Sequence, residues 1–235
     1  MYSLLKKKVR RFAKVLLAEE EKNISVQLQR LAGVETARYV QSKMSKVKAF
    51  SSQEEVMRYA LGRVEKSGGG DGESIILAEF GVFEGKSINY IASLVDKEQK
   101  IYGFDCFDGL PLDWRTDFER GTFKVDALPK VAPNVVLIKG LFSDTLPRFV
   151  AEHQTERYAL LHIDCDLYES TKDVLTNLAG KIGTGTVLVF DEYFNYPGWQ
   201  LGEYKAFQEF VLEKRLEYEY IAYNALHEQV AVRIL

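Results

Sequence analysis

The residues that decide the fold are Ile75-Ile76-Leu77-Ala78-Glu79-Phe80, followed at once by Gly81-Val82-Phe83-Glu84-Gly85-Lys86-Ser87. A nearly continuous apolar run of this length predicts a strand that is buried on both faces of a sheet. Gly81 and Gly85 permit a tight turn, after which the apolar residues recur at helical spacing. A buried strand that turns directly into a helix predicts a parallel βαβ arrangement.

The same alternation of strands and helices continues along the chain. Further strands are predicted at four apolar runs: 101–104, 135–138, 159–163 and 187–190. Helices are predicted after the strands, at 87–95, 146–153, 170–179 and 204–212. Two β-rich runs, 218–223 and 228–235, are separated by only four residues, which is too short for a parallel crossover. These elements predict an α/β fold with a doubly wound, mostly parallel, seven-stranded sheet that ends in an antiparallel hairpin.

We place this sheet domain at residues 73–235 and predict a helical N-terminal extension and linker at residues 1–72. Residues 1–22 have the pattern of a basic amphipathic helix, whose apolar face consists of Leu5, Val9, Phe12 and Leu16. Such a face either docks on the protein or a second copy of it, or lies on an anionic membrane. We favour docking and expect a homodimer. Ser52 and Glu55 have capping-box spacing at the start of the last helix of the extension, and 67–72 predicts a flexible connector.

Composition limits the classes of partner. The 235 residues are 46% hydrophobic and 28% charged, as in ordinary globular proteins, and the net charge of -3 argues against a nucleic-acid partner. No apolar run approaches the roughly 18 residues that span a bilayer. Cys106 and Cys165 lie in or beside predicted strands, which favours buried, reduced thiols and the cytoplasm. The sequence therefore favours a small-molecule partner.

The first strand's exit is the expected ligand site, because open α/β sheets bind ligands beyond the carboxyl ends of their strands. Gly81 and Gly85 allow close approach of the backbone, and Ser87 is predicted to cap a helix whose N-terminus attracts a carboxylate. Asp105, at the end of the second strand, is placed to accept hydrogen bonds from ribose hydroxyls. A Walker A loop and a dinucleotide fingerprint are both absent. These residues predict an adenosine-type cofactor, and the alternative is a tight turn beside an incidental acid.

Four acidic residues follow two later strands. Asp164 and Asp166 end the run His162-Ile163-Asp164-Cys165-Asp166, and Asp191-Glu192 ends the next strand. Neighbouring strands lie about 4.8 Å apart, so these carboxylates would repel one another unless a cation lay between them. Oxygen ligands suit a hard cation such as Mg²⁺. The alternative is that single acids cap helices or form ion pairs.

These segments resemble the macrocin O-methyltransferase (TylF-like) family of class I S-adenosylmethionine-dependent methyltransferases. The matching stretches are 79–87, 103–111, 140–147, 162–171 and 190–193. The resemblance implies methyl transfer from S-adenosylmethionine to a hydroxyl, often on a natural-product sugar. It also implies Mg²⁺, or another divalent cation, held by Asp164, Asp191 and Glu192. This chain carries Asp-Glu at 191–192, where the family has Asp-Asp.

The implied cofactor contacts include Glu79, Phe142 and Ser143 besides Gly81, Gly85, Ser87, Asp105 and Asp164. For the proton of the acceptor hydroxyl we favour Asp166 as the base, with His162 as the alternative and Asp164 beside them. The aromatic residues of the loop 193–199 either stack on an acceptor or pack on the sheet. The predicted function is metal-dependent O-methylation of a small molecule. The alternative is a non-catalytic protein of the same fold that binds S-adenosylmethionine or a nucleotide.

Overall fold

The computed structural model describes residues 22–64 and 74–235. Except for Lys22, the predicted amphipathic helix over 1–22 lies outside the described residues, as does the connector over 67–72. Contacts between the described residues divide them into a sheet unit, residues 46–64, 74–194 and 199–235, and a second unit, residues 22–45 with 195–198. Residues 46–64 thus group with the sheet, and the predicted boundary at residue 73 stays a prediction.

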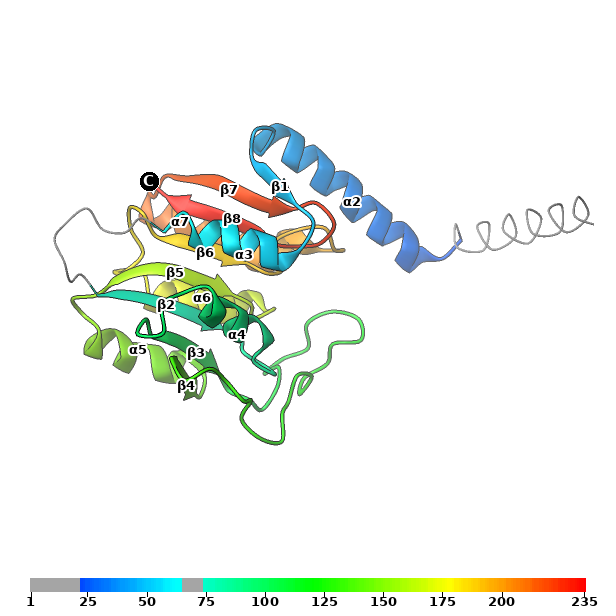
Figure 1. Ribbon diagram of the computed structural model, residues 1–235. Coiled ribbons are helices and arrows are strands. Elements are labelled where there is room, and N and C mark those ends of the chain that lie inside the picture. The colour runs from blue at the N-terminus through cyan, green and yellow to red at the C-terminus, as the bar shows by residue number, and fades with distance from the viewer. Residues whose placement is uncertain (1–21, 65–73) are drawn as a thin grey trace, which may run out of the picture. The chain divides into compact units, whose positions relative to one another are not determined.

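The sheet unit contains one mixed sheet in the order β1-β7-β8-β6-β5-β2-β3-β4 (Figure 1). Its strands are β1 Lys48–Phe50, β2 Ile75–Phe80, β3 Ile101–Asp105, β4 Val135–Lys139, β5 Arg157–Ile163, β6 Val187–Phe190, β7 Tyr218–Asn224 and β8 Val230–Ile234. Strand β8 runs antiparallel to both of its neighbours, whereas the other pairs are parallel. The predicted fold class and terminal hairpin are confirmed.

The sheet has eight strands where the sequence predicted seven. The additional strand β1 lies within a stretch that was expected to be helical, and it pairs in parallel with β7 at the edge of the sheet. Only three residues long, it is too short to show the alternation by which half-buried strands are recognised. Its hydrogen-bond partner β7 is distant in sequence, so tertiary pairing decides its conformation.

Helices cover both faces of the sheet. They are α3 Gln53–Leu61, α4 Lys86–Ser93, α5 Phe142–Glu152, α6 Tyr168–Asn177 and α7 Glu203–Lys214, with a 3₁₀ turn at Trp199–Leu201. Helices α3 and α4 contact each other, while α6 contacts both α5 and α7. In Figure 1 α3 and α4 lie in front of the sheet, and α6 and α7 lie behind it. The predicted capping interaction is present, because Ser52 Oγ accepts the Glu55 N–H at 3.2 Å.

The central strands β2 and β5 form the core. Leu77, Phe80, Leu160 and Ile163 expose at most 1% of their surface, which confirms the predicted burial of these strands on both faces. Because the strands are held on both sides, the residues that follow their carboxyl ends have fixed positions. This is the edge where the acidic residues and the glycine turn meet.

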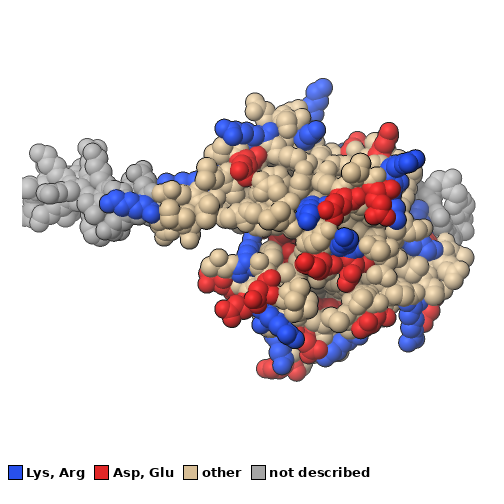
Figure 2. Space-filling view, turned by 180° about the vertical axis from the view of Figure 1, so that it is seen from behind, with Lys and Arg blue, Asp and Glu red and all other residues tan. Residues whose placement is uncertain are grey.

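The second unit contains α2, Ile24–Lys43, whose N-cap Asn23 accepts the Ser25 N–H at 2.9 Å. The segment 195–198 joins this unit through Asn195, which donates to Thr36 Oγ1 and accepts from Gln29 Nε2. Among the described residues, no helix combines the length and apolarity that a bilayer crossing requires. On the face shown in Figure 2, acidic and basic side chains are interspersed.

Candidate active site

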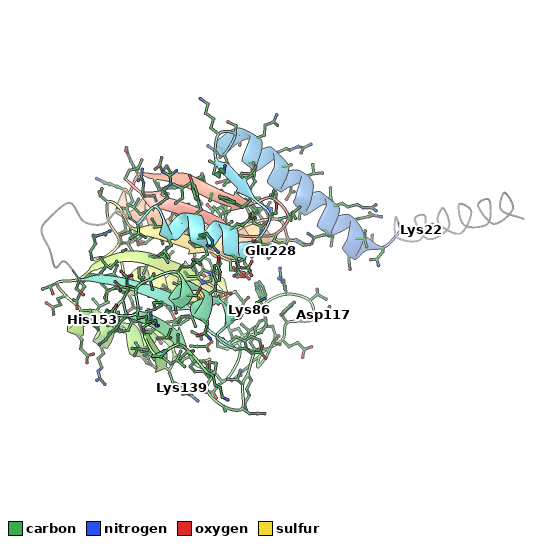
Figure 3. The ribbon with its side chains drawn as sticks, in the orientation of Figure 1. Lys22, Lys86, Asp117, Lys139, His153 and Glu228 are labelled. Carbon is green, nitrogen blue, oxygen red and sulfur yellow. The ribbon has the colours of Figure 1, made fainter. Side chains whose placement is uncertain are left out.

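A cavity of about 680 Å³ opens at the carboxyl ends of β2, β3, β5 and β6. Nine residues predicted to have functional roles line it: Gly81, Ser87, Asp105, Phe142, Ser143, Asp164, Asp166, Asp191 and Glu192. Three others, Glu79, Gly85 and His162, are not among its lining residues. Figure 3 shows Lys86, which also lines the cavity, toward the same end of the sheet as Glu228 and Asp117.

The turn after β2 brings the first strand's exit against the exit of β5. Gly81 has φ 94, and a Cβ at this position would lie 1.6 Å from the Asp164 carbonyl oxygen. Gly85, with φ 78, is the N-cap of α4 and supplies no side-chain cap. The prediction that Ser87 caps this helix was therefore wrong. Its hydroxyl donates to Glu79 Oε1 at 3.1 Å instead, because the left-handed Gly85 starts the helix earlier.

Asp105 joins two turns through backbone hydrogen bonds. Its Oδ2 accepts from the N–H groups of Val82 (2.8 Å) and Phe83 (2.9 Å), and Oδ1 accepts from Phe107 N–H at 2.6 Å. A carboxylate oxygen accepts two hydrogen bonds, so Oδ1 keeps capacity for a ribose hydroxyl. The side chain thus has a structural role besides the predicted cofactor contact.

We expect Asp105→Ala to weaken cofactor binding by about 1.5–3 kcal/mol, the contribution of a charge-assisted hydrogen bond. Stability should also fall, by about 1–3 kcal/mol, because three N–H groups lose their acceptor. Calorimetric titration with S-adenosylhomocysteine and urea unfolding measure the two effects. Asp108→Ala is the control, since that side chain is 70% exposed. Unchanged affinity would remove Asp105 from the cofactor site and leave only its structural role.

Glu79 and His162 form a buried pair behind the cavity. They are directly opposite each other in the parallel register of β2 and β5, and His162 Nδ1 lies 2.8 Å from Glu79 Oε2. Both side chains are fully buried. Burial raises the pKa of Glu79 above its ordinary value, which His162 partly offsets. Burial lowers the pKa of His162, but the neighbouring carboxylates of Asp191 and Glu79 favour the charged imidazole more strongly, so this pKa lies well above its ordinary value.

Asp191 accepts hydrogen bonds at both carboxylate oxygens. Gln53 Nε2 donates to Oδ1 at 2.5 Å and Gln229 Nε2 donates to Oδ2 at 3.1 Å. His162 Nε2 lies 3.6 Å from Oδ1, beyond good hydrogen-bond length, although its charge acts at that range. Burial raises the pKa of Asp191, yet His162 outweighs it and the pKa lies below its ordinary value. Asp191 is therefore the acid of this site that stays ionised most readily.

Asp166 occupies a strained backbone position at the cavity. Its φ is 63, and Leu167 N–H donates to the Cys165 carbonyl at 2.6 Å, the pattern of a γ-turn centred on Asp166. Non-glycine residues in such conformations are concentrated at functional sites. Burial raises the pKa of Asp166 to about 7, with Arg115 opposing and Asp191 adding to the increase. A carboxyl with this pKa suits the exchange of protons near neutral pH.

Glu203 contacts the backbone of both acid-bearing turns, the one after β5 and the one after β6. It is the first residue of α7 and is fully buried. Its Oε2 accepts the Glu192 N–H at 3.2 Å, and its Oε1 lies at the longer distance of 3.5 Å from the Cys165 N–H. Burial raises the pKa of Glu203 well above its ordinary value, although these two backbone N–H groups oppose the increase. Glu203 thereby connects Cys165, which lies between Asp164 and Asp166, with Glu192, which follows Asp191.

Sequence reasoning missed Gln53, Gln229 and Glu203. Gln53 lies in the segment assigned to the extension, and Gln229 follows the turn of the hairpin. An acid at the first position of a helix is common, so the spacing of Glu203 carried no signal for a buried role.

The aromatic residues of the loop after β6 were expected either to stack on an acceptor or to pack on the sheet. Tyr193, Phe194 and Trp199 expose at most 3% of their surface. They pack in the interior, which leaves stacking on an acceptor to other residues.

A cluster suited to a metal ion lies at this edge. His162, Asp164 and Asp191 each offer a ligand atom, and these atoms lie within 4.8 Å of one another. Glu192 lines the adjoining wall. Burial and the charge of Asp191 raise the pKa values of Asp164 and Glu192 well above their ordinary values. Such mutual repulsion is what a bound divalent cation would relieve.

In the metal-free protein we expect stability to fall as pH rises from about 4 to above 7. Asp164, Asp166, Glu192 and Glu203 have raised folded pKa values, so the folded state binds more protons than the unfolded state across this window. The derivative of unfolding free energy with pH is then negative. Thermal unfolding in EDTA at several pH values measures it. Asp166→Asn should flatten the part between pH 4 and 7, and a melting temperature that rises with pH would contradict the expectation.

The strand order, with the antiparallel strand β8 between β6 and β7, is that of the class I methyltransferase fold. Residues 78–193 match the family model described as a methyltransferase domain. The solved calicheamicin methyltransferase CalS11 superimposes with a TM-score of 0.60 at 24% identity over 77% of each chain. The O-methyltransferase NovP gives 0.52 at 23% identity, over 77% of this chain and 76% of that one.

Two curated relatives are named as O-methyltransferases. The 8-demethyl-8-(2,3-dimethoxy-alpha-L-rhamnosyl)-tetracenomycin-C 4'-O-methyltransferase of Streptomyces olivaceus is 34% identical over 100 residues, 42% of this chain and 34% of the relative. Demethyldecarbamoylnovobiocin O-methyltransferase of Streptomyces niveus is 39% identical over 74 residues, 31% of this chain and 27% of the relative. The chain matches about a third of the length of these relatives. The predicted resemblance is confirmed at the level of such O-methyltransferases.

Proposed function

We propose that this protein is an S-adenosylmethionine-dependent O-methyltransferase that acts on a hydroxyl of a small molecule, such as a sugar or glycosylated natural product. One observation carries the proposal: the glycine turn after β2 and the four acids after β5 and β6 line a single cavity. The curated relatives, named as O-methyltransferases, support the same reaction. The acidic cluster disfavours the alternative of a non-catalytic binding protein, since unopposed buried acids cost stability.

The cofactor wall of the cavity is assigned to Gly81, Asp105 and the first residues of α5. Gly81 lets the backbone come close to the ligand, and Asp105 offers Oδ1 to a ribose hydroxyl. Phe142 and Ser143 begin α5 beside the expected adenine position. When bound, S-adenosylmethionine supplies an electrophilic methyl group on a sulfonium centre. Ser87 and Glu79 support this wall from behind through their hydrogen bond.

The acid side of the cavity fits a divalent cation. Asp164 and Asp191 supply hard oxygen donors, Glu192 adjoins them, and His162 Nε2 is a buried atom without a hydrogen-bond partner. Oxygen donors suit Mg²⁺, while the imidazole also suits softer ions such as Mn²⁺. When bound, such a cation would lower the pKa of an acceptor hydroxyl. His162 holds Asp191 in place through charge, and Gln53 and Gln229 fix its orientation.

The proposed reaction is a displacement at the methyl carbon. The acceptor oxygen forms the new bond to the methyl carbon, the carbon–sulfur bond breaks, and its electron pair stays on sulfur as the thioether of S-adenosylhomocysteine. Asp166 takes the hydroxyl proton, because its carboxyl lines the cavity and its pKa of about 7 permits proton uptake and release. Arg115 stabilises the ionised form of Asp166 before the proton arrives.

The test measures S-adenosylhomocysteine release from S-adenosylmethionine with a panel of hydroxylated glycosides, with Mg²⁺ and with EDTA. We expect turnover that requires both an acceptor and a divalent cation. Calorimetric titration with S-adenosylmethionine, and with NAD as control, separates cofactor binding from turnover. Tight cofactor binding without transfer to any acceptor would favour the non-catalytic alternative. Full turnover in EDTA would support the transferase assignment and refute the requirement for a metal.

A further inference from the structure

The long connection between β3 and β4, residues 106–134, supplies most of an aromatic surface inside the cavity. Four rings line the cavity and form what we call the aromatic wall: Phe83, Trp114, Phe118 and Phe123. Their ring centroids are linked in series, with 5.3 Å between Phe83 and Phe123, 5.6 Å between Phe118 and Phe123, and 5.1 Å between Trp114 and Phe118. Phe83 comes from the turn after β2, so two separate segments build this surface.

Two of these rings sit on strained backbone. Phe83 has φ 47 and Phe123 has φ 68, in the left-handed region that bulky side chains rarely adopt. Glycine or asparagine would occupy these positions at lower cost. A strained conformation kept at a cavity wall indicates a functional constraint. The two positions bring phenylalanine rings together in an edge-on contact with an interplanar angle of 70°.

The connection that carries the wall is held by its own hydrogen bonds. Leu110 N–H donates to the Thr122 carbonyl at 2.8 Å, and Gly121 N–H donates to the Leu110 carbonyl at 2.9 Å. The two arms touch so closely that a Cβ on Gly109, whose φ is 84, would lie 2.4 Å from the Gly121 carbonyl oxygen. Asp113 Oδ1 accepts the Arg120 N–H at 2.8 Å. The rings are therefore preorganised to receive a ligand.

Arg115 places one end of the wall beside the acids. Its guanidinium carbon lies 3.9 Å from the Trp114 ring centroid and 5.2 Å from that of Phe118. The same guanidinium is 3.2 Å from a Glu228 oxygen, and its charge acts on Asp166. A ring bound on the wall would thus lie next to the carboxylates that handle the hydroxyl.

We propose that the aromatic wall is the acceptor subsite and takes a flat, apolar ring that carries the reacting hydroxyl or adjoins it. This proposal rests on the proposed methyl transfer and names the class of its acceptor. Aromatic faces attract flat apolar rings by offset or edge-on stacking, and bind puckered rings less well because fewer atoms make contact. The remaining end of the cavity, at Phe142 and Ser143, is left for the adenine.

The experiment measures binding of 2-naphthol by fluorescence titration, with S-adenosylhomocysteine saturating and Mg²⁺ present. Decahydro-2-naphthol, a puckered molecule with the same hydroxyl, competes as the matched probe. We expect 2-naphthol to bind about tenfold more tightly than its saturated analogue, in line with the energy of ring stacking. Equal affinities, or no 2-naphthol binding at millimolar concentration, would overturn the subsite.

Two variants locate the binding energy. Phe123→Asn should weaken 2-naphthol binding about tenfold while its melting temperature stays the same or rises, because the ring is lost and the backbone strain relieved. Phe118→Leu keeps apolar volume without a flat ring and should also weaken binding, so the test does not depend on one variant. Asp117→Gly is the control, because it relieves a positive φ of 70° in the same connection. It should change neither the affinity for 2-naphthol nor that for S-adenosylhomocysteine.

The cofactor affinity separates the outcomes. S-adenosylhomocysteine binding should stay within about twofold in both aromatic variants. An equal loss of S-adenosylhomocysteine affinity would assign the wall to the adenine and overturn the proposal, as would unchanged 2-naphthol affinity in both variants. Because probe binding needs no turnover, its failure is distinct from failure of the transferase assay.

Discussion

Replacing Asp191 by Asn together with Glu192 by Gln is expected to lower methyl transfer by roughly 10³-fold or more while leaving cofactor affinity nearly unchanged. A bound metal contributes several kcal/mol to such a reaction, and about 1.4 kcal/mol corresponds to tenfold in rate. The cofactor residues lie at the exits of β2, β3 and β4, whereas Asp191 and Glu192 follow β6. Initial rates and calorimetric titration with S-adenosylhomocysteine measure the two effects.

The two substitutions should change stability in opposite directions in the metal-free protein. Glu192→Gln removes a buried acid whose pKa is raised by burial and by Asp191, so it relieves repulsion. Asp191→Asn replaces one acceptor oxygen by an NH₂ group that faces a glutamine donor, and it removes the charge beside His162. The cost is about 1–3 kcal/mol. Urea unfolding of the single variants tests these signs.

Asp96→Asn with Glu98→Gln is the matched control, because it removes the same two charges at an exposed turn after α4. Its rate should equal that of the wild type. If the Asp191 and Glu192 variant keeps full activity, or if the wild type keeps it in EDTA, Asp166 acts without a metal and the metal site is refuted.

Gly81→Ala is expected to destabilise the protein by about 4 kcal/mol or more, the range that marks severe backbone or core conflicts. The added Cβ would lie 1.6 Å from the Asp164 carbonyl oxygen and would sit on φ 94. The clash is with backbone between two central strands, so no side-chain rotation relieves it. Urea unfolding measures the loss of unfolding free energy. A variant that still folds should bind S-adenosylhomocysteine more weakly.

Gly180→Ala is the control for this substitution. No atom lies within 4 Å of the position that its Cβ would take, and its φ is not in the left-handed region. Its stability should therefore match the wild type or exceed it slightly, because alanine reduces the entropy of the unfolded chain. A Gly81→Ala protein with the same midpoint as Gly180→Ala would contradict the close packing of β2 against β5 at this turn.

The predicted dimer and the docking of residues 1–22 stay predictions, as does the cytoplasmic location. The individual roles of the site residues also stay predictions, although the cavity gathers most of them. The ligand set Asp164, Asp191 and Glu192 also stays a prediction: the group suited to a metal ion consists of His162, Asp164 and Asp191, and Glu192 lines the cavity beside them. His162 was predicted as the alternative base, and in the structure its Nδ1 lies 2.8 Å from Glu79 and its Nε2 3.6 Å from Asp191.

By itself the sequence determined the buried parallel strands, the hairpin and the gathering of acids at strand ends. Those features depend on local apolar runs and on the rule that the ends of parallel strands share one edge. Tertiary structure alone decided the contacts that cross the chain. Gln53 and Gln229 reach Asp191 from distant segments, and Glu203 meets two turns at once. The aromatic wall depends on positive φ angles in an irregular connection, which no periodicity encodes. Long-range packing fixes such positions, so sequence spacing could not reveal them.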